Sequence, residues 1–497
     1  MRRAEVHAVL SGGPRQLVAL TDTDGQFELR DLPAGSWTVR ASKTGLVTKA
    51  YGQRGLSGPG ESITLGDGQQ FTADFALMRG GVITGRVFDD GGEPIANVRV
   101  SAMRSQLTPN GRRMIGIGGG PGMTDDTGAF RLFGLAPGDY YVSAAPQTMN
   151  LSAGLVTSQG SLTYAPTYFP GTIESSAAQR ISLGAGEEQH NINFALSSTP
   201  AVRVSGVVVS PNSVPLQGMV DLRGAGPESL PVRESRVGTS ADGSFTLPAV
   251  PPGNYVLEFT GRITSPDVPP QVAALPIAVG GGDLTGLTII TSQGATIHGT
   301  VVADGGGRLE AAGIRATAPP AGRAGFTPRA QVTADGSFEL EGLIGPHSMQ
   351  FERLPSGWIV KSIIANGVDV TDVPLEFRGT EQVSARVVLT DRVTRITGTV
   401  RAEASPHGAG ILVFPDDRSK WLPTSRYLRT ARAGDKGQFT FSALPGNERY
   451  LAVALDYIEA GEHLDPEFLE RVRVLATSFS LAEGEQKPIE LTLKPRP

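Results

Sequence analysis

The chain has no cysteine among its 497 residues. This absence excludes disulfide bonds, zinc–thiolate sites and thiol nucleophiles together. It also fits an extracytoplasmic protein, in which a stray thiol is a liability, although many cytosolic proteins lack cysteine too.

Long apolar runs and clusters of positive charge are also missing. Because no stretch of about 18 apolar residues exists, we expect no membrane-spanning helix. The start, Met1-Arg2-Arg3, is followed by no sustained apolar segment, so we expect no signal peptide in this chain. The formal net charge is −5 and no Lys/Arg cluster contains interleaved aromatics, which excludes nucleic-acid binding.

Helical patterns are scarce, and turn residues are abundant. The one good helix candidate spans Pro466 to Leu475, with Asp465 as its N-cap. In contrast, 64 glycines and 36 prolines separate short runs of Val, Ile, Leu, Thr, Phe and Tyr. This punctuation predicts many short strands joined by turns.

A turn glycine, a Phe two residues later and an apolar residue five further on recur five times along the chain. The copies are Gly25/Phe27/Leu32, Gly128/Phe130/Leu135, Gly243/Phe245/Val250, Gly336/Phe338/Leu343 and Gly437/Phe439/Leu444. A Pro/Gly turn follows each copy, and then an aromatic residue in four of them, Trp37, Tyr140, Tyr255 and Tyr450; the fourth copy has Ser348-Met349 instead. The pattern predicts a pair of β-hairpins in every repeat.

An apolar-x-Gly-x-Val strand precedes four of the five copies. It is centred on Gly85, Gly206, Gly299 and Gly398, so one unit is about a hundred residues long, the size of a small sandwich. The first copy lacks this strand, and Ala4–Ala8 aligns with Val98–Ala102 of the second. We therefore expect the chain to begin inside a domain and the natural polypeptide to start upstream, the alternative being a degenerate terminal repeat.

Together these motifs resemble the carboxypeptidase regulatory-like domain, a transthyretin-like sandwich that is also similar to the B-type repeats of bacterial adhesins. The resemblance implies an all-β fold: a tandem array of about five seven-stranded antiparallel β-sandwich domains, prealbumin-like with Greek-key topology, the first one incomplete. The expected domains are residues 1–79, 80–199, 200–293, 294–392 and 393–497. Linkers of a few residues predict a semi-rigid rod.

No catalytic constellation is recognisable. None of the six histidines has a Glu three residues on, so the zinc motif of the metallocarboxypeptidases is missing. The glycine-rich stretch Gly116–Gly120 lacks the Lys-Ser/Thr of a phosphate loop. Asp22–Gly25 and Asp125–Gly128 offer oxygen ligands for calcium, but turn chemistry explains them without a metal. We expect no enzyme activity, no cofactor and no metal.

The candidate ligand-binding residues are aromatic. Tyr164, Tyr168 and Phe169 fall in one proline-containing segment, and Trp358 and Trp421 lie outside the repeat pattern. Aromatic faces stack on sugar rings, while the alternative is that Tyr168 and Phe169 plug the end of their own sandwich.

The leading hypothesis is a non-catalytic, exported scaffold or binding protein that is periplasmic, secreted or on the cell surface. Its partner would be a carbohydrate or another cell-envelope protein. The alternatives are a carbohydrate-binding protein that uses the exposed aromatics, and an accessory part of a peptidase whose catalytic domain is absent from this chain.

Overall fold

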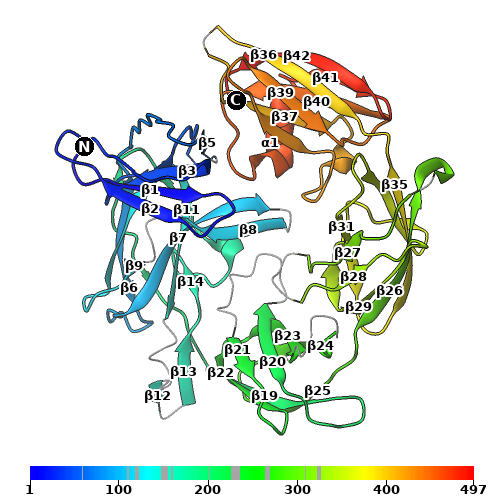
Figure 1. Ribbon diagram of the computed structural model, residues 1–497. Coiled ribbons are helices and arrows are strands. Elements are labelled where there is room, and N and C mark those ends of the chain that lie inside the picture. The colour runs from blue at the N-terminus through cyan, green and yellow to red at the C-terminus, as the bar shows by residue number, and fades with distance from the viewer. Residues whose placement is uncertain are drawn as a thin grey trace.

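The computed structural model describes residues 1–56, 58, 60–108, 111–117, 122–146, 155–157, 160–200, 202–224, 235–262, 269–307, 309–321, 326–403 and 405–497. Almost all regular structure in this part is β (Figure 1). We refer to the five stretches predicted above as modules 1 to 5, and these limits remain a proposal. The stretch Gly118–Gly120 of the glycine-rich segment lies outside the described residues.

The strands of each module follow in chain order. Module 1 has β1 (Glu5–Leu10), β2 (Gln16–Leu20), β3 (Gly35–Ser42), β4 (Lys49–Ala50) and β5 (Ser62–Leu65). Module 2 has β6 (Gly81–Phe88), β7 (Val98–Thr108), β8 (Gly111–Gly116), β9 (Gly122–Met123), β10 (Ala129–Leu135), β11 (Gly138–Pro146), β12 (Leu155–Thr157), β13 (Gly160–Tyr164), β14 (Thr167–Tyr168), η1 (Ser175–Ala177), β15 (Ile181–Leu183), β16 (Glu188–Gln189), β17 (Phe194–Ala195) and, at its limit, β18 (Ser198–Pro200). Module 3 has β19 (Val202–Val209), β20 (Gly218–Gly224), β21 (Ser235–Gly238), β22 (Ser244–Val250), β23 (Gly253–Gly261), β24 (Val272–Val279) and β25 (Leu284–Ile290).

Modules 4 and 5 complete the chain. Module 4 has β26 (Ala295–Ala303), η2 (Asp304–Gly306), β27 (Arg315–Thr317), β28 (Arg329–Gln331), β29 (Ser337–Leu343), β30 (Gly345–His347), β31 (Gln350–Glu352), β32 (Ile359–Ala365), β33 (Val368–Asp369), β34 (Leu375–Phe377) and β35 (Gln382–Thr390). Module 5 has β36 (Arg395–Arg401), β37 (Gly410–Pro415), η3 (Arg418–Lys420), β38 (Arg429–Arg432), β39 (Gln438–Ser442), β40 (Glu448–Leu455), η4 (Glu462–Leu464), α1 (Pro466–Arg473), β41 (Thr477–Leu481) and β42 (Gln486–Lys494).

The glycine-containing strand is the centre of one sheet in modules 2 to 5. These strands, β6, β19, β26 and β36, pair antiparallel with the Phe-containing strand, as in β22-β19-β25 of module 3. On the other side each pairs with a strand near the end of its module, and that pairing is parallel. The sheets are therefore mixed, whereas the resemblance implied antiparallel sandwiches.

The glycine and the Phe of the repeat are direct cross-strand partners. Gly85 faces Phe130, and the same register recurs in the other three modules, Gly206 with Phe245, Gly299 with Phe338 and Gly398 with Phe439. A Cβ on Gly299 would lie 2.0 Å from the Phe338 ring, and one on Gly85 would lie 2.0 Å from the Ile192 carbonyl oxygen. The Phe ring therefore packs in space that only glycine leaves open.

The Val of the strand motif is tied to the turn glycine. The amide of Val301 donates to the carbonyl of Gly336 at 2.8 Å, and the same bond joins Val87 to Gly128, Val208 to Gly243 and Val400 to Gly437. Gly336 has a φ of 85°, which disfavours any side chain at this turn. The two halves of the sequence motif are thus fastened to each other by backbone hydrogen bonds.

The aromatic residue after the second turn bonds back to that turn. Tyr140 Oη donates to the Ala136 carbonyl at 2.5 Å, and Trp37, Tyr255 and Tyr450 bond to the carbonyls of Pro33, Pro251 and Pro445. In module 4, where the aromatic is missing, the buried His347 takes this place, with Nε2 3.1 Å from the Ile344 carbonyl and Nδ1 2.7 Å from the Ala318 carbonyl.

Module 5 has a second hydrophobic core. Alternate residues of β37 point to opposite sides, Ile411 and Val413 into the sandwich and Leu412 and Phe414 toward α1. Helix α1 buries Phe468, Leu469 and Val472 against that outer side, and Asp465 caps it by accepting from the amide of Glu467 at 3.0 Å. The predicted helix and its cap are confirmed, and the helix is a packing element of module 5.

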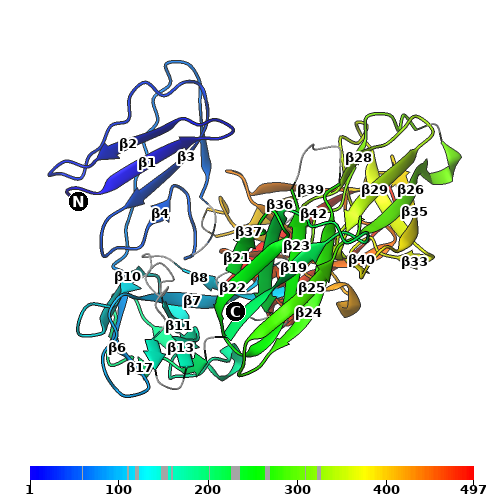
Figure 2. The ribbon, with the colours of Figure 1, turned by 90° about the horizontal axis from the view of Figure 1, so that it is seen from below.

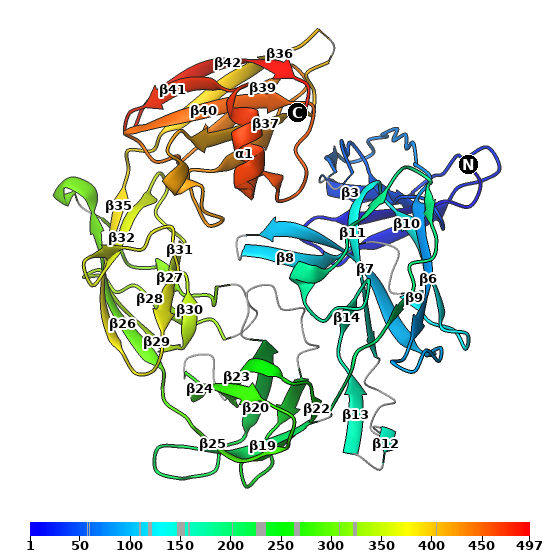
Figure 3. The ribbon, with the colours of Figure 1, turned by 180° about the vertical axis from the view of Figure 1, so that it is seen from behind.

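The five modules form a ring rather than the expected rod. They follow one another around a closed loop, and module 5 returns to modules 1 and 2 (Figures 1 and 3). The amide of Leu56 donates to Glu459 Oε1 at 2.7 Å, and Gln106 Nε2 donates to the Ala460 carbonyl at 2.5 Å. Short linkers limit the flexibility between modules but do not fix the orientation of one module relative to the next. The long-range contacts of module 5 with modules 1 and 2 fix that orientation.

Gly299→Ala tests the glycine–Phe packing. We expect module 4 to lose about 1–3 kcal/mol of unfolding free energy, because the new methyl overpacks the Phe338 ring. Denaturant unfolding measures the loss. Gly379→Ala is the matched control, since a Cβ there meets nothing within 4 Å. Equal stability of the two variants would contradict the assignment.

Candidate functional site

Two of the predicted binding aromatics are buried. Tyr168 is 1% exposed on β14, and Trp421 is 7% exposed in the second core of module 5. The Trp421 indole Nε1 donates to the Pro415 carbonyl at 2.8 Å. The open ring face that sugar stacking requires is absent at both positions, so the expectation of exposed aromatics fails for them. Trp421 serves α1 packing, a role that the repeat pattern could not reveal.

The other three aromatics are half-buried and scattered. Tyr164 and Phe169 pack against the core of module 2, and Trp358 packs against the core of module 4. Burial raises the pKa of Tyr164, and the nearby carboxylates of Asp89 and Asp90 raise it further. The structure does not gather the five predicted residues on one face. The burial of Tyr168 and the packing of Phe169 against the core of module 2 favour the alternative, that these two residues plug the end of their own sandwich.

The histidines are dispersed and engaged in local contacts. His190 lies 3.0 Å from Thr84 Oγ1, and His298 Nε2 lies 2.6 Å from Gln382 Oε1. Burial lowers the pKa of His463. Among the described residues, His407 is the one histidine beside two carboxylates. Its Nε2 lies 3.2 Å from Glu61 Oε2 and its Nδ1 lies 3.0 Å from Asp435 Oδ1. Glu61 belongs to module 1, so this cluster links the two ends of the ring.

In the two turns whose sequences offer oxygen ligands for calcium, a carboxylate accepts hydrogen bonds from backbone amides of the same turn. Asp22 Oδ1 accepts from the amides of Asp24 and Gln26 at 2.9 and 2.8 Å. Asp125 Oδ1 accepts from the hydroxyl of Thr127 and from the amides of Ala129 and Thr127, and these hydrogen bonds, the hydroxyl's first, lower the pKa of Asp125. The carboxylate oxygen therefore stabilises the turn, as its sequence predicts.

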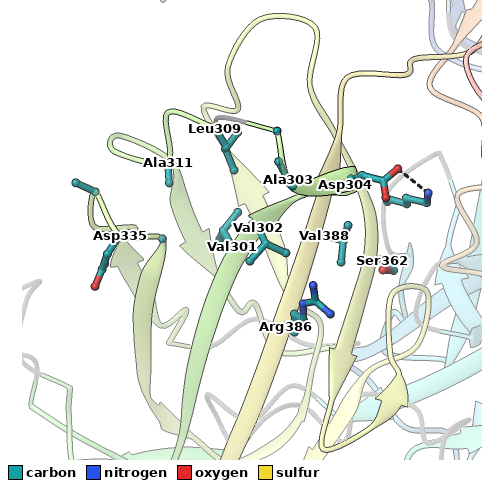
Figure 4. Close-up of a pocket in the computed structure, with 16 residues that line it drawn as sticks. Val301, Val302, Ala303, Asp304, Leu309, Ala311, Asp335, Ser362, Arg386 and Val388 are labelled. Carbon is teal, nitrogen blue, oxygen red and sulfur yellow. Dashed lines mark hydrogen bonds and ion pairs between the residues drawn. The ribbon is translucent and has the colours of Figure 1, made fainter.

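A cavity of about 800 Å³ lies in module 4 at the end of β26 (Figure 4). Val301, Val302 and Val388 give it an apolar wall, and Asp304, Asp335 and Arg386 add charge. The glycines Gly305 to Gly307 and Gly336 form part of its rim. No sequence signal pointed to this cavity, because its lining comes from four separate stretches of the chain.

An ion network joins this cavity to module 5. Lys361 Nζ lies 2.7 Å from both Asp304 Oδ2 and Glu483 Oε1, and Arg392 contacts the same two carboxylates at 2.6 and 3.1 Å. Hydrogen bonds from Lys361 and Arg392 lower the pKa of Asp304, and the carboxylates raise the pKa of Lys361. Since Glu483 is in module 5, the network fixes one module against the next.

A second polar contact crosses the same junction. Arg426 of module 5 donates from its backbone amide to Asp372 Oδ1 at 3.0 Å and from Nη1 to the Val360 carbonyl at 2.9 Å. Asp372 lies between β33 and β34 of module 4. This contact is a second polar link between modules 4 and 5.

Apolar packing completes the closure of the ring. Leu107, at the end of the long strand β7 of module 2, packs against the second core of module 5 together with Ile458. A Cβ on Gly461, whose φ is 79°, would lie 2.4 Å from the Leu107 carbonyl oxygen. The β7–β8 hairpin thus docks on the segment that leads into α1.

Residues 1–78 match the sequence model of the carboxypeptidase regulatory-like domain. The match confirms the resemblance that the repeat motif predicts. No curated protein matches the chain. Within the described residues, no helix is long and apolar enough to cross a membrane.

Several solved structures are similar to the chain, with low TM-scores. The Bacillus anthracis TIE protein is 10% identical, with 87% of this chain and 80% of that chain covered and a TM-score of 0.18. A streptococcal ancillary pilin is 15% identical over 59% of this chain and 92% of its own, with a TM-score of 0.23. GBS52, a minor pilin of Streptococcus agalactiae, is 14% identical, with 38% of this chain and 95% of that chain covered and a TM-score of 0.23. TM-scores this low support no conclusion about fold or role.

Leu107→Asp tests the closure of the ring. We expect the ring to open, because the substitution places an unpaired carboxylate in an apolar contact. Small-angle scattering should show a larger radius of gyration and maximum dimension. Ile290→Asp, at a position that is 64% exposed in module 3, is the control. An unchanged scattering curve for Leu107→Asp would contradict the contact.

Asp335→Asn tests the turn carboxylate beside the cavity. Hydrogen bonds from Thr333 and Ser337 lower the pKa of Asp335 to about 2. A lowered pKa in the folded state stabilises the protein above the unfolded value of about 4, and this contribution disappears as pH falls toward 2. The Tm of Asp335→Asn should therefore be below that of the wild type at pH 6, with the difference shrinking to near zero at pH 2.

Calorimetry across this range measures the effect. Asp391→Asn, which changes an exposed carboxyl of the same module, is the control. A difference between wild type and Asp335→Asn that stays constant with pH would contradict the role of the charge.

Proposed function

We propose that the chain is a non-catalytic, exported scaffold or binding protein built of carboxypeptidase regulatory-like modules. The observation that carries the proposal is the use made of the reactive side chains. The ring of His347 lies between two backbone carbonyls, and His407 lies beside Glu61 of module 1. Lys361 contacts both Asp304 of module 4 and Glu483 of module 5. These ionisable side chains make contacts within one module or between two modules, and such contacts support a structural role.

An extracytoplasmic location is part of the proposal. Its support is the lack of cysteine and the resemblance of the repeats to modules of exported proteins. The partner is proposed to be a carbohydrate or another cell-envelope protein. The carbohydrate role has the weaker support, because Tyr168 and Trp421 are buried and only Tyr164, Phe169 and Trp358 keep partial exposure.

Turnover and polymer-binding assays test this function. The purified chain is incubated with pools of peptides, esters and glycosides, and separately with insoluble polysaccharides including peptidoglycan. We expect no turnover; hydrolysis that scales with protein concentration and survives repurification would overturn the non-catalytic role. Saturable polysaccharide binding that Tyr164→Ala/Trp358→Ala abolishes would establish the carbohydrate role instead of a protein partner.

A further inference from the structure

Strand β2 of module 1 is the edge strand of its sheet (Figure 2). The strand order is β2-β1-β3-β4, and among the described residues β2 pairs with β1 alone. The corresponding strands of modules 3, 4 and 5, which are β21, β28 and β38, are also the last strands of their sheets. A complete module therefore leaves this edge open, because its central strand pairs with other strands.

The edge directs the backbone hydrogen-bonding groups of three residues away from the sheet. The Arg15 carbonyl accepts from β1, and the Thr21 amide donates to the residue that precedes β1, so the odd-numbered residues of β2 face β1. Alternate residues of a strand direct their amide and carbonyl to opposite sides. The groups of Gln16, Val18 and Leu20 consequently point to the open edge, where another strand can pair with them.

The exposed face of β2 is largely apolar. Val18 is 53% exposed and Leu20 is 62% exposed, while Leu17 packs against the core of module 1. The strand Gln16–Leu20 contains no charged residue. This edge therefore combines open backbone groups with exposed apolar side chains, which is the combination that favours pairing with another chain.

The equivalent edges of modules 3, 4 and 5 carry arginine. A backbone amide four residues before each turn glycine bonds to the neighbouring segment in the same way, and this bond aligns Thr21 with Thr239, Val332 and Ala433. In this alignment the positions of Val18 and Leu20 are occupied by Arg236 and Gly238, by Arg329 and Gln331, and by Thr430 and Arg432. Charge on an edge strand opposes pairing with another chain, and β2 lacks that protection.

We propose that two copies of the chain form a dimer in which their β2 strands pair antiparallel across a two-fold axis at Val18. In this register Gln16 of one copy faces Leu20 of the second copy, and the two Val18 residues face each other. Each outward amide then meets an outward carbonyl, and the two module 1 sheets become one continuous sheet. The dimer goes beyond the scaffold role and does not depend on it.

Charge complementarity favours a second copy as the occupant of the edge. Antiparallel pairing brings the exposed Arg15 of each copy beside the exposed Asp22 of the other, so opposite charges lie at both ends of the paired strands. The same pairing of two β28 strands, centred on Arg329, would instead place two like charges together at the axis.

Sedimentation velocity of the full chain over a range of concentrations tests the dimer. We expect a reversible monomer–dimer equilibrium that Val18→Arg weakens about tenfold or more, because two guanidinium groups would face each other at the axis. The variant should fold, since module 4 has Arg329 at this position. Val214→Arg, at a position that is 56% exposed between β19 and β20, is the matched control and should dimerise like the wild type.

Single cysteines test the register, because the chain has no other cysteine. Val18→Cys places the two thiols at the axis, where Cα atoms about 5.5 Å apart permit a disulfide. Gln16→Cys is the off-axis control, since its two copies would be four residues, or about 14 Å, apart along the strands. We expect air oxidation to give a covalent dimer of Val18→Cys and not of Gln16→Cys.

Three outcomes would overturn the proposal. The wild type could stay monomeric at its highest soluble concentration, which would rule out a second copy as the occupant. Val18→Arg could dimerise as strongly as the wild type, or Gln16→Cys could cross-link as readily as Val18→Cys, and either result would place the contact elsewhere.

Discussion

The cross-strand pairing of a glycine with a Phe organises each complete module. The missing Cβ lets the Phe ring and the parallel neighbouring strand approach the central strand closely, and the Val two residues on is fastened to the turn that precedes the Phe. One central strand thereby joins the turn, the Phe strand and the last strand. The rest of the sandwich packs against the sheet that results. Among the described residues of module 1, which has no such strand, one hydrogen-bonded sheet is present.

Local features of this design could be predicted from sequence, because they depend on neighbouring residues. The turn glycines, the returning aromatics and the helix capped by Asp465 each have a conformational cause that acts over a few residues. The repeat pattern does not predict that His347 replaces the aromatic residue in module 4. His347 lies directly before Ser348 and contacts the turn through a ring nitrogen, so it does not match the aromatic of the repeat.

The candidate sites were predicted poorly, because they depend on contacts between distant residues. The amide of Leu56 and the carboxylate of Glu459 form a hydrogen bond between modules 1 and 5. The sequence around either residue does not predict this contact. Trp421 was predicted to be exposed because it falls outside the repeat. It is instead part of the second core of module 5, which packs against α1. The segment that leads into α1 contacts the β7–β8 hairpin, and this contact helps to close the tandem array into a ring.

Amide hydrogen exchange across the whole chain tests most directly whether the central strand completes a module. The account predicts fast exchange at residues 27–32 and 71–77, which lack backbone partners, and protection slower by orders of magnitude at their counterparts in β10, β22 and β29. Comparable protection in module 1 and in the complete modules would contradict it, because these two segments of module 1 would then be paired without the strand on which the rest of the fold depends.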